Sequence, residues 1–253
     1  MQSYLALFLL GLIQGLTEFL PVSSSGHLVL FSKIFGIEES LFLSIILHVA
    51  TLFSIVVVFY KDVWNLIRHP FSKETMQLAV ATIPTCIIVL ILMPVIKQSF
   101  AGGLLPICFA STAVVLWISE MLSSKKIGNK LDYKGQIFMG VAQGLAVFPG
   151  ISRSGATISA GLLAGRNKSE VAKFSFIMSL PIIILSLVME IFDISTTGID
   201  LDFGTGPIIL SFLTAFIVGI VALKVVLKLT EKSNLKWFSF YLILISIVSL
   251  FVL

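Results

Sequence analysis

The residues best suited to chemistry lie in a 13-residue pattern that occurs twice in the chain. The first copy, residues 14–26, reads QGLTEFLPVSSSG, and the second copy, residues 143–155, reads QGLAVFPGISRSG. Seven of the 13 positions are identical although the copies are 129 positions apart, which indicates that part of the chain was duplicated. Two related segments of this kind can build one site if the fold brings them together.

The positions at which the two copies differ carry the charged and titratable groups. The unlike pairs are Glu18 with Val147, Ser24 with Arg153 and, one residue beyond the pattern, His27 with Ala156. One copy therefore holds a carboxylate and an imidazole among serines, and the other holds a guanidinium among serines and glycines. We predict a polar site that is divided between the copies.

The first copy contains groups for nucleophilic and acid–base catalysis. Pro21 ends a half-helix, and a second half-helix begins near Ser24 or Ser25, where free backbone N–H groups favour an anion. Ser24 or Ser25 is suited to attack phosphorus, His27 to move the proton, and Glu18 to orient His27 or to bind a divalent ion. The alternative is structural: the serines cap the helix, and His27 is hydrogen-bonded within a core.

The second copy, which continues as PGISRSGAT over residues 149–157, offers donors for a phosphate group. Arg153 presents a planar fork of N–H donors that matches phosphate oxygens. It is the only Arg or Lys that hydropathy places at membrane depth, so it needs an anionic partner, either a phosphate or, in a structural role, Glu18. Together the copies predict a phosphate pocket in which Arg153 and backbone N–H groups hold the charge of the transition state.

The composition places the whole chain in the membrane class. Of its 253 residues, 57% are apolar and only 12% are charged, which is outside the range of soluble domains. The formal net charge of +4 is read first as a topology signal, so nucleic acid is not a predicted partner. The expected surroundings are membrane lipid.

Six segments are apolar over roughly the 20 residues that a bilayer-spanning helix needs. They are residues 41–60, 77–96, 104–122, 174–192, 207–223 and 237–253. Two further stretches, residues 4–35 and 135–165, contain the repeat copies and are apolar at both ends but broken in the middle by Pro, Gly and Ser. We therefore predict an all-α polytopic membrane protein with six full-spanning helices and two re-entrant helix pairs.

Basic residues in the connections predict how the chain is oriented. If the connection after residues 41–60 is cytoplasmic, that side collects 14 of the 17 Lys and Arg residues. Stretch 135–165 then enters from the cytoplasm and returns to it, and stretch 4–35 does the same from outside. A single membrane domain of two inverted repeats follows, about 1–122 and 123–253. Irregular backbone at membrane depth must be buried or line a wet cavity, so we expect the two tips to meet.

The same residues resemble the bacitracin-resistance (BacA or UppP) family of undecaprenyl-pyrophosphate phosphatases. The family's first motif, (E/Q)xxxE followed by PVSS(S/T)GH, matches Gln14, Glu18 and residues 21–27, and its second, PGxSRSGxT, matches residues 149–157. The resemblance covers essentially the whole chain. It implies a phosphatase of the bacterial cytoplasmic membrane that hydrolyses undecaprenyl diphosphate at a site open to the extracytoplasmic side, which recycles the lipid carrier of cell-wall synthesis and confers bacitracin resistance.

Matched motif by motif, the resemblance implies roles for eleven residues. The catalytic residues are Ser24 as the nucleophile, His27, Glu18 and Arg153. The supporting phosphate contacts are Gln14, Ser23, Ser25, Ser152, Ser154, Gly155 and Thr157. Because Gln14 stands where the motif also allows glutamate, Glu18 is the only motif carboxylate that could bind a Mg or Ca ion.

A rival interpretation is an isoprenyl-phosphate transporter or flippase without hydrolysis, because inverted repeats with broken helices are typical of transporters. A carrier needs donors for an anion but no hydroxyl beside an imidazole. The sequence leaves open whether Ser24 or an activated water attacks, which metal assists, which chain length is preferred, whether the lipid product is also translocated, and whether the protein is a monomer or a homodimer. For His48, near the outer end of segment 41–60, the sequence does not decide between a packing role and a place at the rim of the site.

Overall fold

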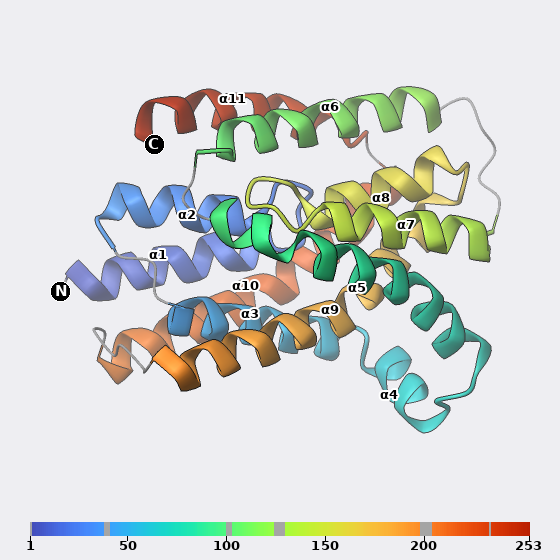
Figure 1. The fold of residues 1–253 in the computed structure, drawn as a ribbon, viewed down its shortest axis with the longest axis horizontal. Helices are drawn as coiled ribbons and strands as arrows, with labels where there is room; N and C mark the ends of the chain where they lie inside the picture. Colours follow the sequence, from blue (N-terminus) through green and yellow to red (C-terminus); the bar gives the residue numbers. More distant parts are fainter. Residues whose placement is uncertain (1, 38–40, 100–102, 124–129, 198–203, 233) are drawn as a thin grey trace.

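All regular secondary structure in the described part of the chain is helical. The computed structural model describes residues 2–37, 41–99, 103–123, 130–197, 204–232 and 234–253. The helices in chain order are α1 (Gln2–Thr17), α2 (Ser24–Phe35), α3 (Leu41–Val58), α4 (Tyr60–Arg68), α5 (Lys73–Ser99), α6 (Leu105–Ser123), α7 (Tyr133–Leu145), α8 (Arg153–Leu163), α9 (Lys168–Thr197), α10 (Thr205–Lys232) and α11 (Lys236–Val252). Most of them run along the length of the molecule (Figure 1).

The length and hydropathy of these helices make the chain a multi-pass membrane protein. Within the described ranges, α5, α6, α9 and α10 are each long and apolar enough to cross a bilayer, and α3 with α4 adds a fifth crossing if the pair counts as one span. Helix α11 is apolar but has only 17 residues, or roughly 25 Å at 1.5 Å per residue. The sixth predicted span, residues 237–253, therefore stays a prediction.

One helix covers residues 41–58 of the predicted span 41–60, and the chain bends sharply where that span ends. Helix α3 ends at Val58, and the chain bends by 87° into α4. The Arg68 guanidinium lies 4.7 Å from the centre of the Trp64 ring, and Lys173 of α9 pairs with Asp62 at 2.7 Å. After the bend, α4 points away from the long axis of the bundle (Figure 1).

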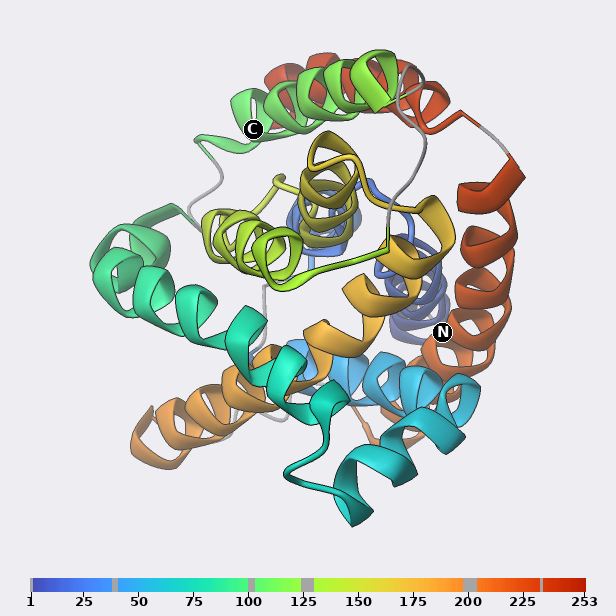
Figure 2. The ribbon, with the colours of Figure 1, turned by 90° about the vertical axis from the view of Figure 1, so that its right-hand side faces the viewer.

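The helices that carry the repeat copies lie inside the bundle. Viewed from one end, α7 and α8 occupy the middle with α1 and α2 behind them, and the other helices surround these four (Figure 2). Helix α1 packs along α10 and α7 along α5, while α8 packs against α6 and α2 against α11. Leu30, Phe109 and Ile158, from α2, α6 and α8, are fully buried in one apolar cluster. The broken segments are thus held by helices on all sides.

Glycines three residues before the start of each copy let the inner helices pack closely. A Cβ atom on Gly11 of α1 would lie 2.5 Å from the carbonyl oxygen of Ser211 on α10, and one on Gly140 of α7 would lie 2.0 Å from the carbonyl oxygen of Ala81 on α5. Gly11 and Gly140 are separated by the same 129 positions as the motif copies. The two copies therefore pack alike, each against a helix from the other half of the chain.

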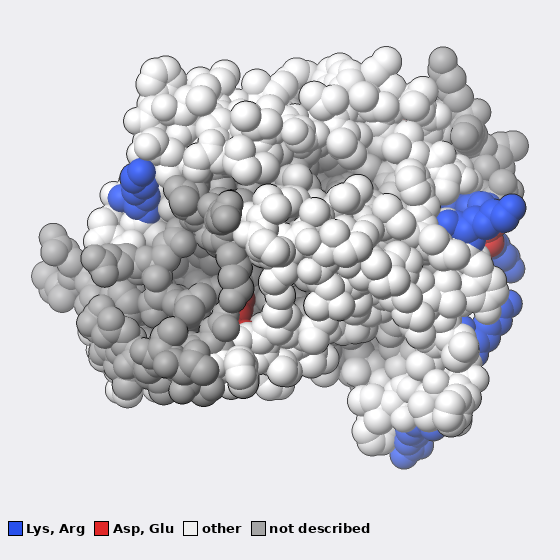
Figure 3. All heavy atoms as spheres, in the orientation of Figure 1, with Lys and Arg blue, Asp and Glu red and all other residues white. Residues whose placement is uncertain are grey.

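Charge is concentrated at the ends of the molecule. In the view of Figure 3, Lys and Arg side chains gather mainly at one end, and the long side between the two ends is almost free of charge. A surface with little charge between charged ends is the surface expected next to lipid.

Candidate functional site

The two breaks in the inner helices contact each other directly. The Ser23 hydroxyl accepts a hydrogen bond from the Gly150 backbone N–H at 3.1 Å, and the Ser154 hydroxyl donates to the Leu20 carbonyl at 3.0 Å. A Cβ atom on Gly26 would lie 2.7 Å from the Gly150 nitrogen, so the approach requires a residue without a side chain. The expectation that the two tips meet is confirmed by these contacts.

A serine caps the helix that follows each break. Ser23 accepts a hydrogen bond from the Gly26 N–H at 3.4 Å at the start of α2, and Ser152 accepts one from the Gly155 N–H at 3.1 Å at the start of α8. Ser23 has a φ angle of 70°, a left-handed conformation that is uncommon for a residue with a side chain and that clusters at functional sites. Residues at both helix N-termini line one cavity, so both helix dipoles favour an anion there.

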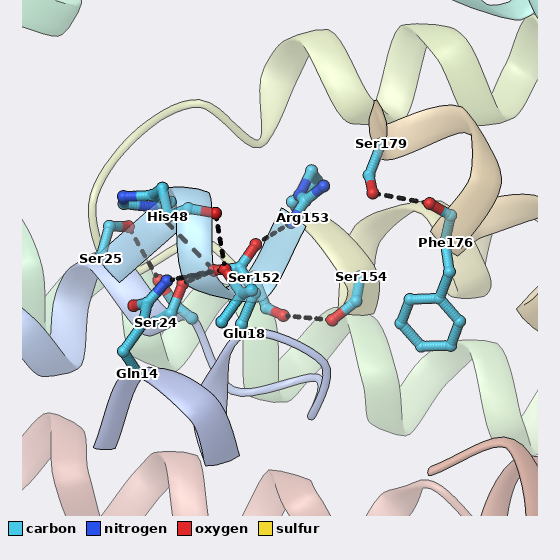
Figure 4. A network of polar contacts seen from close by, with 12 residues as sticks. Gln14, Glu18, Ser24, Ser25, His48, Ser152, Arg153, Ser154, Phe176 and Ser179 are labelled. Carbon is cyan, nitrogen blue, oxygen red and sulfur yellow. Dashed lines mark hydrogen bonds and ion pairs between the residues drawn. The ribbon is translucent and has the colours of Figure 1, made fainter. Parts of the chain in front are cut away.

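Glu18 is the centre of the polar network. One carboxylate oxygen, Oε2, accepts hydrogen bonds from the Ser24 hydroxyl at 2.5 Å and from the Gln14 side-chain amide at 3.0 Å. The other oxygen, Oε1, pairs with Nη2 of Arg153. The Glu18 side chain is only 2% exposed, and Figure 4 shows these groups converging on it from both repeat copies. A carboxylate in contact with a serine hydroxyl is placed to remove the hydroxyl proton.

Arg153 has a buried donor nitrogen without a partner among the described residues. Its Nη2 pairs with Glu18, but Nη1 is buried and has no hydrogen-bond partner among the described residues. A buried donor without a partner is costly, so this nitrogen favours a ligand with oxygen acceptors. Arg153 therefore fits both interpretations left by the sequence, because it pairs with Glu18 and still offers a donor to a phosphate.

The network opens into a cavity of about 360 Å³. One wall is polar and contains seven of the predicted site residues. They are Glu18, Ser23, Ser24, Ser25, Ser152, Arg153 and Ser154. Another wall, formed by α5 and α9, is mostly apolar, through residues such as Val89, Met93, Ile182 and Leu185, although α9 also adds Ser186 and Glu190. A cavity with one polar and one apolar wall suits a ligand that has a charged head and a hydrocarbon chain.

Three of the other predicted residues lie behind the polar wall. Gln14 is fully buried, and its amide contacts Glu18 and, at 3.5 Å, Thr51. The Thr157 hydroxyl is 2.6 Å from the Ser175 hydroxyl, and the Gly155 N–H donates to Ser152. In this structure these groups brace the residues of the cavity wall, and their roles as direct phosphate contacts stay predictions.

His27 is also away from the cavity wall. Its Nδ1 is 2.7 Å from the Ser23 carbonyl oxygen, and its Nε2 is 2.7 Å from the Tyr241 hydroxyl on α11. The ring is stacked on Tyr241 and packed edge-on against Phe109. Because protein groups occupy both ring nitrogens, the structure does not bring His27 into hydrogen-bond contact with Ser24, and its role as a proton shuttle stays a prediction.

Comparison with known proteins identifies the family. The family model described as bacitracin resistance protein BacA matches residues 7–248. The chain belongs to this family. It is 40% identical to the undecaprenyl-diphosphatase of Carboxydothermus hydrogenoformans, an alignment that covers 99% of this chain and 97% of that protein. It is 37% identical to the undecaprenyl-diphosphatases of Christiangramia forsetii, over 95% of both chains, and of Methanosphaera stadtmanae, over 99% of this chain and 98% of that one.

The residues around the BacA family motifs do not fit a divalent cation held by the protein alone. No group of three or more His, Cys, Asp or Glu side chains comes together anywhere in the described residues. Glu18 is the motif carboxylate, and donors from Arg153, Ser24 and Gln14 already occupy its two oxygens. Hard cations such as Mg²⁺ need several oxygen ligands, which often include substrate phosphates. Glu18 is thus better placed as a base than as a metal ligand.

Two residues outside the motifs contact residues of the site, and nothing in the sequence indicates their role. The Thr112 hydroxyl of α6 accepts a hydrogen bond from the Ser152 N–H at 3.1 Å and donates to the Gly150 carbonyl at 3.2 Å. Tyr241 is hydrogen-bonded to His27. Both lie in apolar helices, where the sequence does not reveal which side chain faces the breaks. His48, which the sequence leaves open, lines the cavity.

Proposed function

We propose that the protein is a membrane phosphatase that hydrolyses undecaprenyl diphosphate to undecaprenyl phosphate and inorganic phosphate, which recycles the lipid carrier of cell-wall synthesis and confers bacitracin resistance. The observation that carries the proposal is the 2.5 Å contact between the Ser24 hydroxyl and Glu18, beside the unpaired Nη1 of Arg153. Nucleophile, base and phosphate donor thus share one cavity wall. The membership of the BacA family and the shared name of the relatives support the substrate.

The geometry favours attack by Ser24. Glu18 takes the hydroxyl proton as Ser24 Oγ bonds to the terminal phosphorus. The bond between that phosphorus and the bridging oxygen breaks, and its electron pair leaves with undecaprenyl phosphate. Arg153 and the backbone N–H groups at the starts of α2 and α8 stabilise the charge that develops on the phosphoryl oxygens. Water then hydrolyses the phosphoserine and restores the Ser24 hydroxyl.

The same contact separates a phosphatase from a carrier that only moves the lipid. A carrier needs donors for the phosphate, and Arg153 with the helix N-termini would satisfy it. Such a protein has no use for a serine hydroxyl held by a buried carboxylate. The pairing of Ser24 with Glu18 therefore favours hydrolysis.

The proposal includes an inverted repeat of six full spans and two re-entrant pairs, α1 with α2 and α7 with α8, in one membrane domain. The packing supports it. The halves exchange equivalent contacts, because α1 lies on α10 as α7 lies on α5, and α2 contacts α11 as α8 contacts α6. Basic residues gathered mainly at one end (Figure 3) support a cytoplasmic assignment for that end. The site then opens to the extracytoplasmic side of a bacterial cytoplasmic membrane.

In this proposal a divalent cation arrives with the diphosphate, whose oxygens supply the ligands that the protein lacks. One chain supplies every group of the described site, so the proposed hydrolysis needs no second copy of the chain. The preferred substrate has a polyprenyl chain that runs from the apolar wall of the cavity into the surrounding lipid.

The test is phosphate release from farnesyl diphosphate, a soluble C15 analogue, by detergent-purified protein with and without Mg²⁺ or Ca²⁺. We expect the wild type to release phosphate and Ser24→Ala to be slower by at least about 10³-fold. The matched control is Ser111→Ala, because Ser111 is exposed and bonds only within its own helix. A wild type that releases no phosphate under any of these conditions contradicts the proposed function, and a fully active Ser24→Ala protein removes Ser24 as the nucleophile.

A further inference from the structure

A second imidazole stands at the cavity, and the steps described so far do not use it. His48 lies on α3, lines the cavity and has a side chain that is 23% exposed (Figure 4). Its Nδ1 is 2.9 Å from the Ser44 carbonyl oxygen. Because a carbonyl oxygen can only accept, Nδ1 carries the ring proton and donates it. In the neutral ring, Nε2 is then an acceptor.

The distance between His48 and Glu18 suits a bridging water molecule. Nε2 of His48 is 4.0 Å from Oε2 of Glu18, which is too long for a direct hydrogen bond and short enough for one water to contact both atoms. Nε2 of the neutral ring is an acceptor, so the water donates one of its hydrogens to Nε2 and lies in contact with Glu18. Its lone pairs are then free to face the cavity, where the phosphorus of a substrate would lie.

The other imidazole of the site cannot do this in the same geometry. His27 is 1% exposed, and its two ring nitrogens are held by Ser23 and Tyr241. His48 has one nitrogen anchored and the other directed to the carboxylate that contacts Ser24. Of the two, His48 is the imidazole in position to exchange a proton with water in the cavity.

The serine route needs a second base. Glu18 receives the Ser24 proton in the first step and must return it to Oγ when the phosphoserine is cleaved, so it is protonated when the water attacks. We propose that Nε2 of His48, beside Glu18, holds the hydrolytic water and accepts its proton. The inference rests on the proposed phosphatase function with Ser24 as nucleophile.

The step balances with groups of this chain alone. The water oxygen bonds to phosphorus as the bond between phosphorus and Ser24 Oγ breaks, and the electron pair of that bond returns to Oγ. One water proton moves to His48 Nε2, Glu18 returns its proton to Oγ, and inorganic phosphate leaves. The imidazolium then loses its proton to the cavity, so each turnover releases one proton.

The test is a single-turnover reaction of detergent-purified protein with farnesyl diphosphate labelled on its terminal phosphate. In His48→Ala we expect one equivalent of farnesyl phosphate per protein at close to the wild-type rate, label retained on the protein as acid-stable phosphoserine, and a kcat lower by about 10²-fold, the usual size of a lost general base. Because kcat/KM is determined by the phosphorylation step, which His48 does not serve, KM should fall together with kcat and kcat/KM should stay close to the wild-type value.

Two variants control the experiment. Glutamine at this position can accept a hydrogen bond from water but cannot take its proton, so His48→Gln should fold normally and turn over faster than His48→Ala but slower than wild type. His69→Ala should match wild type, because His69 is exposed in the connection after α4. An unchanged kcat in His48→Ala overturns the inference, and so does a slow variant that traps no phosphoserine. A wild type without phosphate release contradicts the phosphatase function instead.

Discussion

At the scale of single residues, one carboxylate connects structure and chemistry. Glu18 and Arg153 come from different repeat copies and form an ion pair in which Glu18 is buried and Arg153 is partly exposed. Removing either partner leaves the other charge unpaired inside the protein, which typically lowers the free energy of unfolding by about 3–5 kcal/mol. The pair therefore holds the two breaks together as well as serving the reaction, and truncating either residue confounds stability with catalysis. Conservative substitutions separate the two effects.

Arg153→Lys separates pairing from phosphate binding. A lysine can keep the charge pair with Glu18, but it is a point charge and cannot reproduce the second donor, the unpaired Nη1. We expect a folded protein whose kcat/KM for farnesyl diphosphate is lower by about 10²-fold, as when one transition-state donor is lost. Phosphate release and thermal unfolding in detergent check this.

The control for this substitution is the reverse exchange at a site far from the cavity. Lys168 pairs with Glu120 near the other end of the bundle, so Lys168→Arg should leave kcat/KM at the wild-type value. Wild-type kcat/KM in Arg153→Lys would mean that Arg153 serves only to neutralise Glu18.

At the scale of helices, the sequence predicts the breaks better than the contacts that hold them. Pro21 and the serines after it predict a broken helix, and the duplication of the pattern predicts a second break in the other copy. The bend after Val58 has no Pro or Gly beside it, the residues that usually cause sharp kinks, so nothing local predicts it. Pro84, in contrast, lies inside the continuous helix α5. Contacts such as Thr112 with Ser152 depend on how helices rotate about their axes, which an apolar span does not encode.

The approach of the two breaks predicts a specific effect of Gly26→Ala. The added methyl would lie 2.7 Å from both the Gly150 nitrogen and the ring of Phe109, so the breaks must move apart. We expect a loss of about 1–3 kcal/mol in the free energy of unfolding, as for other overpacked cores. A displacement near 1 Å should also lower kcat by roughly 10²-fold. Thermal unfolding and phosphate release measure the two effects.

Gly103→Ala is the matched control for the breaks, because a Cβ atom at Gly103 meets no atom within 4 Å. It should keep both the stability and the kcat of the wild type. If Gly26→Ala behaves in the same way, the two breaks do not need to lie in contact for the site to work.

At the scale of the whole molecule, the halves of the chain depend on each other. Each half places its own broken helix against a helix of the other half, α1 on α10 and α7 on α5. The site is likewise divided, with Ser24 and Glu18 from one copy and Arg153 from the other. A duplicated chain whose copies differ in this way forms the polar site only when both halves are folded, and the proposed inverted repeat places the two halves in opposite orientations. The orientation of the membrane domain is therefore part of the functional hypothesis.

That orientation can be measured with two single cysteines in a chain whose native cysteines, Cys86 and Cys108, are replaced by alanine. Lys33 is exposed near the end of α2, and Lys130 is exposed just before α7. The end of α2 and the start of α7 lie at opposite ends of the molecule (Figure 1). An impermeant thiol reagent on intact cells should label Lys33→Cys and reach Lys130→Cys only after permeabilisation, with phosphate release intact in both. Labelling in the opposite pattern would place the basic end outside. The cavity would then open to the cytoplasm, and a carrier lipid that returns from cell-wall synthesis on the outer face could not reach Ser24 without first crossing the membrane.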